Sequence, residues 1–207
     1  HTVAVICERH GDRPPCDEWD GIRVHRIPRQ RRVAAKVSSA QVYVSGRSWH
    51  WQHHVEALVR QERFEALHVH DLYMAPTVLA VGRRHRLPVV VDLHEDFPAM
   101  LALSYRLNGQ DWWRPVRPWL ITRFRQLERR VVEQADHVIV VVEESRDRLL
   151  ALGARPERVT VVTNAVDLEA FTHLPLDPAI VGAFDGQPLV SYIGGLDIKR
   201  GLDTLLE

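Results

Sequence analysis

The sequence predicts an α/β domain built on a doubly wound, mostly parallel sheet of the Rossmann-like kind. Short apolar runs of strand length alternate with longer stretches whose apolar residues recur at helical spacing. Several of the short runs, such as residues 138–142, are continuous and β-branched rather than alternating. Strands that are buried on both faces have this composition. These observations indicate a parallel sheet covered by helices.

Seven runs are predicted as strands because each is apolar and bounded by turn residues or charges. In chain order they are residues 3–7, 22–27, 66–69, 87–93, 137–142, 159–162 and 189–193.

Four stretches between these runs are predicted as helices: residues 49–63, 74–85, 119–134 and 143–152. Pro88 ends the second of them and opens a strand. The third carries Leu120, Phe124 and Val131 on one stripe. Gly153 is suited to cap the fourth at its carboxyl end. The resulting alternation of strand and helix is typical of a doubly wound fold.

The predicted domain organisation has three parts. Residues 1–175 form an amino-terminal domain, and residues 176–188, with their prolines and glycines, form a linker. Residues 189–207 begin a second domain. An apolar run starts almost directly after His1, and a helical pattern beginning at Gly201 stops within two turns, so we expect a fragment cut at both ends.

The composition excludes some function classes. Lys and Arg total 27, as do Asp and Glu, whereas a protein that binds nucleic acid usually has a basic surplus. Cys7 and Cys16 form neither a disulfide framework nor a zinc-type pair. No apolar run approaches the roughly 20 residues that span a bilayer, and no signal peptide opens the chain. We therefore expect a cytoplasmic protein that does not bind nucleic acid.

A stretch with tryptophans leads into an arginine-rich helix and suggests peripheral membrane contact. Trp112, Trp113 and Trp119 lie beside cationic residues, a combination found at membrane surfaces. Glu128 and Glu133 interrupt the positive charge, so a solvated arginine face is the alternative.

Polar side chains follow several predicted strands, where a doubly wound sheet binds its ligands. His68 and His70 lie on one face of a strand and can bind a metal or a polar ligand; a buried His68 satisfied by backbone is the alternative. His70 and Asp71 are better placed, at the strand end. His94 follows a buried strand and can donate to a sugar hydroxyl or stabilise developing charge; bracing of the loop is its alternative.

Glu95 and Asp96 come directly after His94. They can contact a ligand, or they can cap the following segment and brace neighbouring arginines.

Five motifs occur in order: HVHD at 68–71, DLHEDFP at 92–98, Ala135-Asp136 before a valine-rich strand, TNAVD at 163–167 and YIGG at 192–195. Together they resemble the family 4 (group 1) retaining glycosyltransferases of GT-B fold. The resemblance covers nearly the whole chain from about Val3.

The resemblance implies that the first domain holds the acceptor, a saccharide or a lipid-linked one, and that catalysis takes place in the cleft between domains. It implies a catalytic role for His94, near the transferred sugar. The substrate-binding residues would be His70, Asp71, Glu95 and Asn164. Ala165 stands where the family motif around Asn164 has glycine.

The resemblance also implies that the second domain binds a nucleotide diphosphate sugar as donor substrate, with no cofactor and no metal. Gly194, Gly195, Lys199 and Arg200 would face the diphosphate, through close backbone approach and positive charge. Many relatives have arginine where this chain has Gly195.

Two further elements of the family are expected outside this sequence. The first strand, with a glycine-rich loop, would precede Val3, and a pair of donor-binding glutamates would follow Glu207. We therefore expect this fragment to be inactive by itself.

Two other functions remain open at this point. His68, His70 and His94 also suit a metal-dependent hydrolase, although the later strand ends supply few further ligands. A non-catalytic module that binds a saccharide or a partner is the third possibility.

Overall fold

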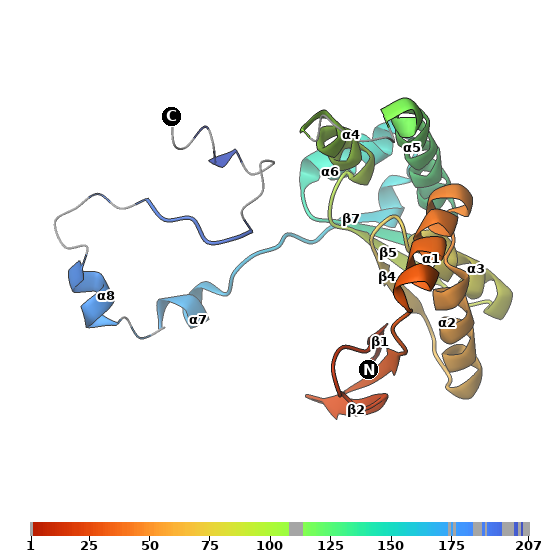
Figure 1. Ribbon diagram of the computed structural model, residues 1–207, viewed down its shortest axis with the longest axis horizontal. Helices are drawn as coiled ribbons and strands as arrows, with labels where there is room; N and C mark the ends of the chain where they lie inside the picture. The colour runs from red at the N-terminus through yellow and green to blue at the C-terminus, as the bar shows by residue number, and fades with distance from the viewer. Residues whose placement is uncertain are drawn as a thin grey trace.

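The computed structural model describes residues 2–107, 114–173, 175, 177–183, 188, 190–195, 201, 202 and 204. Its strands are β1 (Ala4–Glu8), β2 (Cys16–Trp19), β3 (Ile22–Ile27), β4 (Leu67–His70), β5 (Val89–Leu93), β6 (His137–Val140) and β7 (Val159–Val161). Its α-helices are α1 (Arg32–Ser45), α2 (Trp49–Gln61), α3 (Ala75–His85), α4 (Phe97–Leu107), α5 (Arg117–Gln134), α6 (Glu143–Ala151), α7 (Leu168–Thr172) and α8 (Pro178–Ala183) (Figure 1). Short 3-10 turns, Arg114–Val116 and Pro156–Arg158, precede α5 and β7.

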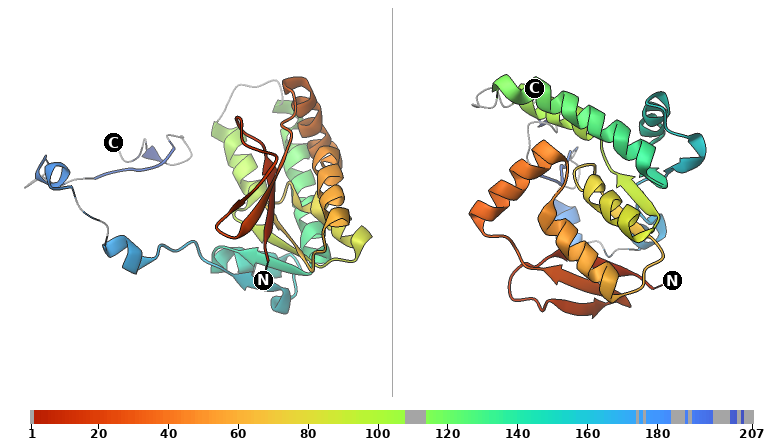
Figure 2. Two further views of the ribbon diagram at one scale, coloured as in Figure 1. Left: turned by 90° about the horizontal axis from the view of Figure 1, so that it is seen from below. Right: turned by 90° about the vertical axis from the view of Figure 1, so that its right-hand side faces the viewer.

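The predicted α/β fold is confirmed. Strands β4, β5, β6 and β7 form a parallel sheet in that order, flanked by helices (Figures 1 and 2). The amino-terminal strands form a second sheet in the order β1-β3-β2, in which β1 runs parallel and β2 antiparallel to β3.

The core lies around the parallel sheet. Strand β5 buries Val89, Val91 and Leu93 almost completely, as the continuous apolar run predicts. Phe124 and Val131 of α5 join the same cluster, on the stripe that the helical spacing predicts. Such valine, leucine and phenylalanine side chains each stabilise the fold by about 1.5–3 kcal/mol through burial.

Helix α3 packs closely on β4 and β5. A Cβ atom at Gly82 would lie 2.3 Å from Cγ2 of Val89 and 2.9 Å from the carbonyl oxygen of Leu87, so only glycine permits this approach. Helix α3 ends at Arg86, whose backbone is in the left-handed region at φ 59°. Pro88 follows and directly precedes β5.

Five helices and strands lie where none was predicted. These are β2, α1, α4, α7 and α8. Neither β2 nor α1 has a buried residue in the described structure. Conversely, residues 190–193, predicted as a strand, form none. Val190 and Ile193 are exposed there, and a lone strand without a partner is not stable.

Helix α8 lies within residues predicted as a linker. The division into two domains stays a prediction. Among the described residues, no helix is both long enough and apolar enough to cross a membrane.

Candidate functional site

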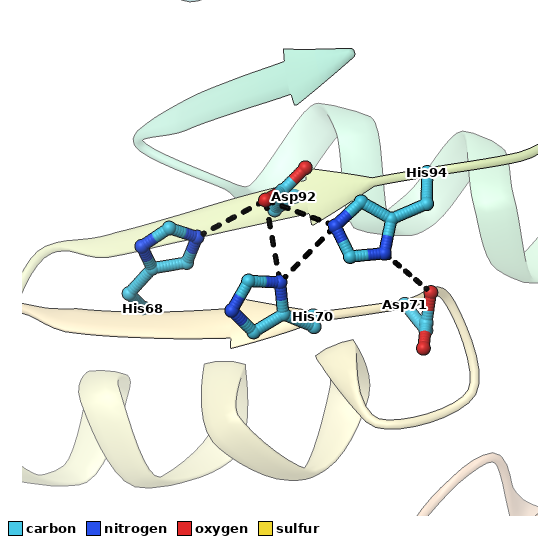
Figure 3. Close-up of polar contacts among 5 residues, drawn as sticks. All are labelled: His68, His70, Asp71, Asp92 and His94. Carbon is cyan, nitrogen blue, oxygen red and sulfur yellow. Dashed lines mark hydrogen bonds and ion pairs between the residues drawn. The ribbon is translucent and has the colours of Figure 1, made fainter. Parts of the chain in front are cut away.

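The site forms where β4 and β5 end side by side. In the parallel register His68 pairs with Val90, and His70 pairs with Asp92. Side chains two residues apart on a strand share a face, so His68 and His70 stand together while Val69 enters the core. His94 follows β5 two residues after Asp92 and turns back over the same spot (Figure 3).

Three imidazoles converge on one carboxylate oxygen, Oδ2 of Asp92. The distances to this oxygen are 3.6 Å from His68 Nε2, 3.2 Å from His70 Nδ1 and 3.2 Å from His94 Nε2. The rings are stacked, with centroids 4.8 Å apart for His68 and His70 and 5.0 Å for His70 and His94. Asp92 is therefore the centre of the cluster, and Figure 3 shows the contacts radiating from it.

Asp71 holds His94 from the other side. Its backbone is in the left-handed region at φ 70°, a conformation that aspartate tolerates better than most residues. Its N–H donates to the carbonyl of Asp92 at 2.9 Å, and its Oδ1 lies 3.4 Å from Nδ1 of His94. His94 thus lies between two carboxylates, one at each ring nitrogen, which fixes the orientation of the imidazole.

Burial shifts two pKa values here. Desolvation is the main cause that lowers the pKa of His68, with the neighbouring His70 adding to it, while Asp92 acts in the opposite direction. Desolvation also raises the pKa of Tyr73, and the negative charge and hydrogen bond of Asp71 add to that shift. His68 and Tyr73 therefore favour their neutral forms.

A cleft with a volume of about 370 Å³ is lined by residues that follow those of the cluster in the chain. Tyr73, two residues after Asp71, and Phe97, three residues after His94, both line it. Its other walls come from α1, α2 and α5, and they include Tyr43, Trp51 and Phe124. Aromatic walls with a few polar groups at the rim suit a ligand with both apolar and polar faces, such as a sugar ring.

A larger cavity of about 460 Å³ lies at the opposite, amino-terminal edge of the sheet. Its acidic residue, Asp136, already accepts a hydrogen bond from the backbone N–H of Val89 at 2.8 Å. Since ligands of such sheets collect at the carboxyl ends of the strands, the smaller cleft is the better candidate.

Asp96 anchors the loop that carries His94. Its Oδ1 accepts from the N–H of Ala99 at 2.9 Å and caps α4, while its Oδ2 lies 3.3 Å from Nε of Arg148. The expectation that an acidic residue here caps the next segment and braces an arginine is confirmed for Asp96.

The structure brings together some of the predicted site residues. His70, Asp71 and His94 form one cluster (Figure 3). Glu95, the next residue in the chain after His94, is exposed. Asn164 is exposed on the segment after β7. Gly194 and Gly195 follow α8 in the chain, and the hydroxyl of Tyr192 donates to the carbonyl of Gly195. Lys199 and Arg200 lie outside the described residues.

The structure also gives the exposure of His68 and of Trp119, two residues for which the sequence made a prediction. His68 is not a buried histidine, since its side chain is 48% exposed. Trp119, of the predicted membrane-contacting stretch, is exposed, whereas Trp112 and Trp113 lie outside the described residues. Membrane contact stays a prediction.

Sequence reasoning did not select Asp92 as a site residue. The available signal was a charged residue inside an otherwise apolar strand, Val89–Leu93. It also missed the ion pair between Glu128 and Arg148, because those residues lie 20 positions apart, on α5 and α6, and meet only in the folded chain.

The fold and the site define a Rossmann-like α/β domain with a polar cluster at the carboxyl edge of its parallel sheet. The family model described as "Glycosyl transferase 4-like domain" matches residues 1–165, so the chain belongs to this family. The resemblance noted in the sequence is thereby confirmed.

One curated relative is the D-inositol 3-phosphate glycosyltransferase of Gordonia bronchialis. It is 31% identical over 83 residues, which cover 39% of this chain and 18% of that protein. The matched segment therefore spans less than one fifth of the relative's length.

Proposed function

We propose that this chain is the acceptor-side part of a glycosyltransferase that transfers a sugar from a nucleotide diphosphate sugar to a saccharide or lipid-linked acceptor, with retention. Its membership of the glycosyl transferase 4-like family supports transfer as the reaction class. The observation that carries the proposal is His94, held between Asp71 and Asp92. Phe97, three residues after His94, lines the aromatic cleft.

His94 is the proposed catalytic residue. Its imidazole, oriented by the two carboxylates, would donate a hydrogen bond to the transferred sugar and stabilise charge that develops in the transition state. His70, Asp71 and Glu95 would contact substrate hydroxyls near it. The cleft lined by Tyr73 and Phe97 would receive the acceptor.

The donor side rests on the resemblance. Asn164 would contact the substrate near the domain boundary, and Gly194, Gly195, Lys199 and Arg200 would face the diphosphate. Backbone amides and cations would stabilise the diphosphate leaving group there, without a metal or another cofactor. The proposed setting is cytoplasmic polysaccharide biosynthesis, with peripheral membrane contact if the acceptor is lipid-linked.

The test is an assay of the product of the complete reading frame against a panel of sugar nucleotides and acceptors. We expect His94→Asn to lower kcat by about 10²–10³-fold, the loss typical of one transition-state hydrogen bond. His53→Asn, a change at an exposed histidine on α2, serves as the control and should leave kcat unchanged.

Full activity in His94→Asn would contradict the role of His94. If the complete protein binds saccharides but turns over no sugar nucleotide, the non-catalytic binding module replaces the enzyme as the proposed function.

A further inference from the structure

The environment of Asp92 is unusual for a carboxylate in a sheet. Its side chain is only 13% exposed, and in the described part of the chain all its ion-pair partners are histidines. A second oxygen, Oδ1, is buried and has no hydrogen-bond partner among the described residues. Such a carboxylate is costly unless a cation accompanies it.

The three ligand atoms lie close enough together to surround one ion. His68, His70 and Asp92 each offer one atom, and all three atoms lie within 4.8 Å of one another. Two of the separations, 3.2 and 3.6 Å, are close to the ~3.3–3.4 Å edge of a tetrahedron whose ligands are 2.0–2.1 Å from zinc. No loop must move far to close the site, because β4 and β5 fix all three backbones in one register.

We propose that His68, His70 and Asp92 bind one divalent transition-metal ion, with His94 remaining on Asp71. Two imidazoles and a carboxylate are the ligand types of zinc and related first-row ions, whereas calcium and magnesium prefer oxygen.

Three protein ligands leave coordination positions open. His68 and His70 are about half exposed, so those positions face solvent and can accept an oxygen of a bound ligand. With the ion bound, the proposed contact of His70 with a substrate hydroxyl would be made through the ion. The inference does not depend on glycosyl transfer, since the ion alone is the probe.

The experiment is a calorimetric titration of this chain with zinc chloride, after treatment with a chelator, at about pH 7.5 where imidazoles are mostly neutral. We expect one high-affinity zinc ion per chain. The double change His68→Asn/His70→Asn should weaken binding by more than ~100-fold, beyond the 10–100-fold loss typical of an outer-shell partner.

The matched control is His50→Asn/His54→Asn, which removes two histidines that meet on α2 with ring centroids 4.8 Å apart. This variant should bind zinc as the original chain does. Zinc should also raise the Tm of the original chain and of this control, but not that of His68→Asn/His70→Asn, a comparison that also reports whether each variant folds.

Absence of high-affinity zinc binding in the original chain would overturn the proposal. So would loss of binding in the α2 control with binding retained in His68→Asn/His70→Asn. His94→Asn should retain zinc while losing transfer, so the failure of this proposal is distinguishable from the failure of the proposed enzyme function.

Discussion

Arg148 donates from both terminal nitrogens to the two carboxylate oxygens of Glu128, at 2.7 and 2.8 Å. The Glu128 side chain is 3% exposed, and the contact joins α5 to α6. Because the same guanidinium also reaches Asp96, it connects the helical layer to the loop that carries His94.

Removing Arg148 should therefore destabilise the domain strongly. Arg148→Met leaves the Glu128 carboxylate buried without a counter-charge, which costs about 3–5 kcal/mol in the free energy of unfolding. Urea denaturation, monitored by circular dichroism, measures this loss in the free energy of unfolding. Arg146→Met is the control: its partner Glu143 is 68% exposed, so the loss should be about 0–1 kcal/mol. Equal losses in both variants would show that burial of Glu128 does not matter.

Gly82→Ala should destabilise the packing of α3 on β5. Alanine gains about 1 kcal/mol of helix propensity over glycine, but its Cβ would meet Val89 and the Leu87 carbonyl oxygen, and overpacking costs about 1–3 kcal/mol. Since one of these atoms belongs to the backbone and cannot easily move, we expect the steric cost to exceed the gain in helix propensity. Gly182→Ala has open space around the new Cβ and should not destabilise the chain. Thermal unfolding gives the Tm of both variants. An unchanged or raised Tm for Gly82→Ala would contradict the expected destabilisation.

Thr77→Val should remove a buried hydrogen bond between helices. The backbone N–H of Ser48 donates to Oγ1 of Thr77 at 3.0 Å, and both residues are at most 2% exposed. Valine has the same shape but leaves this N–H unsatisfied, at a cost of about 1–3 kcal/mol. Thr77→Ser keeps the acceptor and should retain more of the stability. Urea denaturation gives the free energy of unfolding of both variants. A more stable Thr77→Val than Thr77→Ser would contradict the prediction.

Stability should fall as the pH drops below the ordinary histidine pKa of 6.5, because burial lowers the pKa of both His54 and His68 in the folded chain. Between 6.5 and those lowered values, the unfolded chain binds protons that the folded chain does not. The contribution is therefore fully present above 6.5 and is lost as the pH falls through the folded values. Unfolding in urea near pH 7.5 and near pH 5 measures the change, with chelator present to exclude metal.

The variant His54→Asn/His68→Asn should show a smaller decrease over the same pH interval. The matched control His10→Asn changes a histidine in an exposed loop and should keep the original slope. An unchanged slope in the double variant would mean that other groups carry the pH dependence.

Much of the parallel sheet could be predicted because its signals are local. The β-branched runs that became β5 and β6 are buried, as their composition requires, and helical spacing located α3 and α5 within a few residues. The predicted strand at 189–193 is also apolar, but its described residues 190–193 have no strand partner among the described residues, and apolar character alone does not make a strand.

The sequence by itself determined that His70, Asp71 and His94 stand at strand ends, because the strand length and the point where each apolar run stops are encoded locally. Only the tertiary structure decided that Asp92 is the centre of the cluster. Register between β4 and β5 is set by hydrogen bonds between segments some twenty residues apart, and a slip of one residue would turn Asp92 to the other face. The pairing of Glu128 with Arg148 likewise depends on how the fold places α5 and α6 relative to each other. No local sequence pattern predicts it.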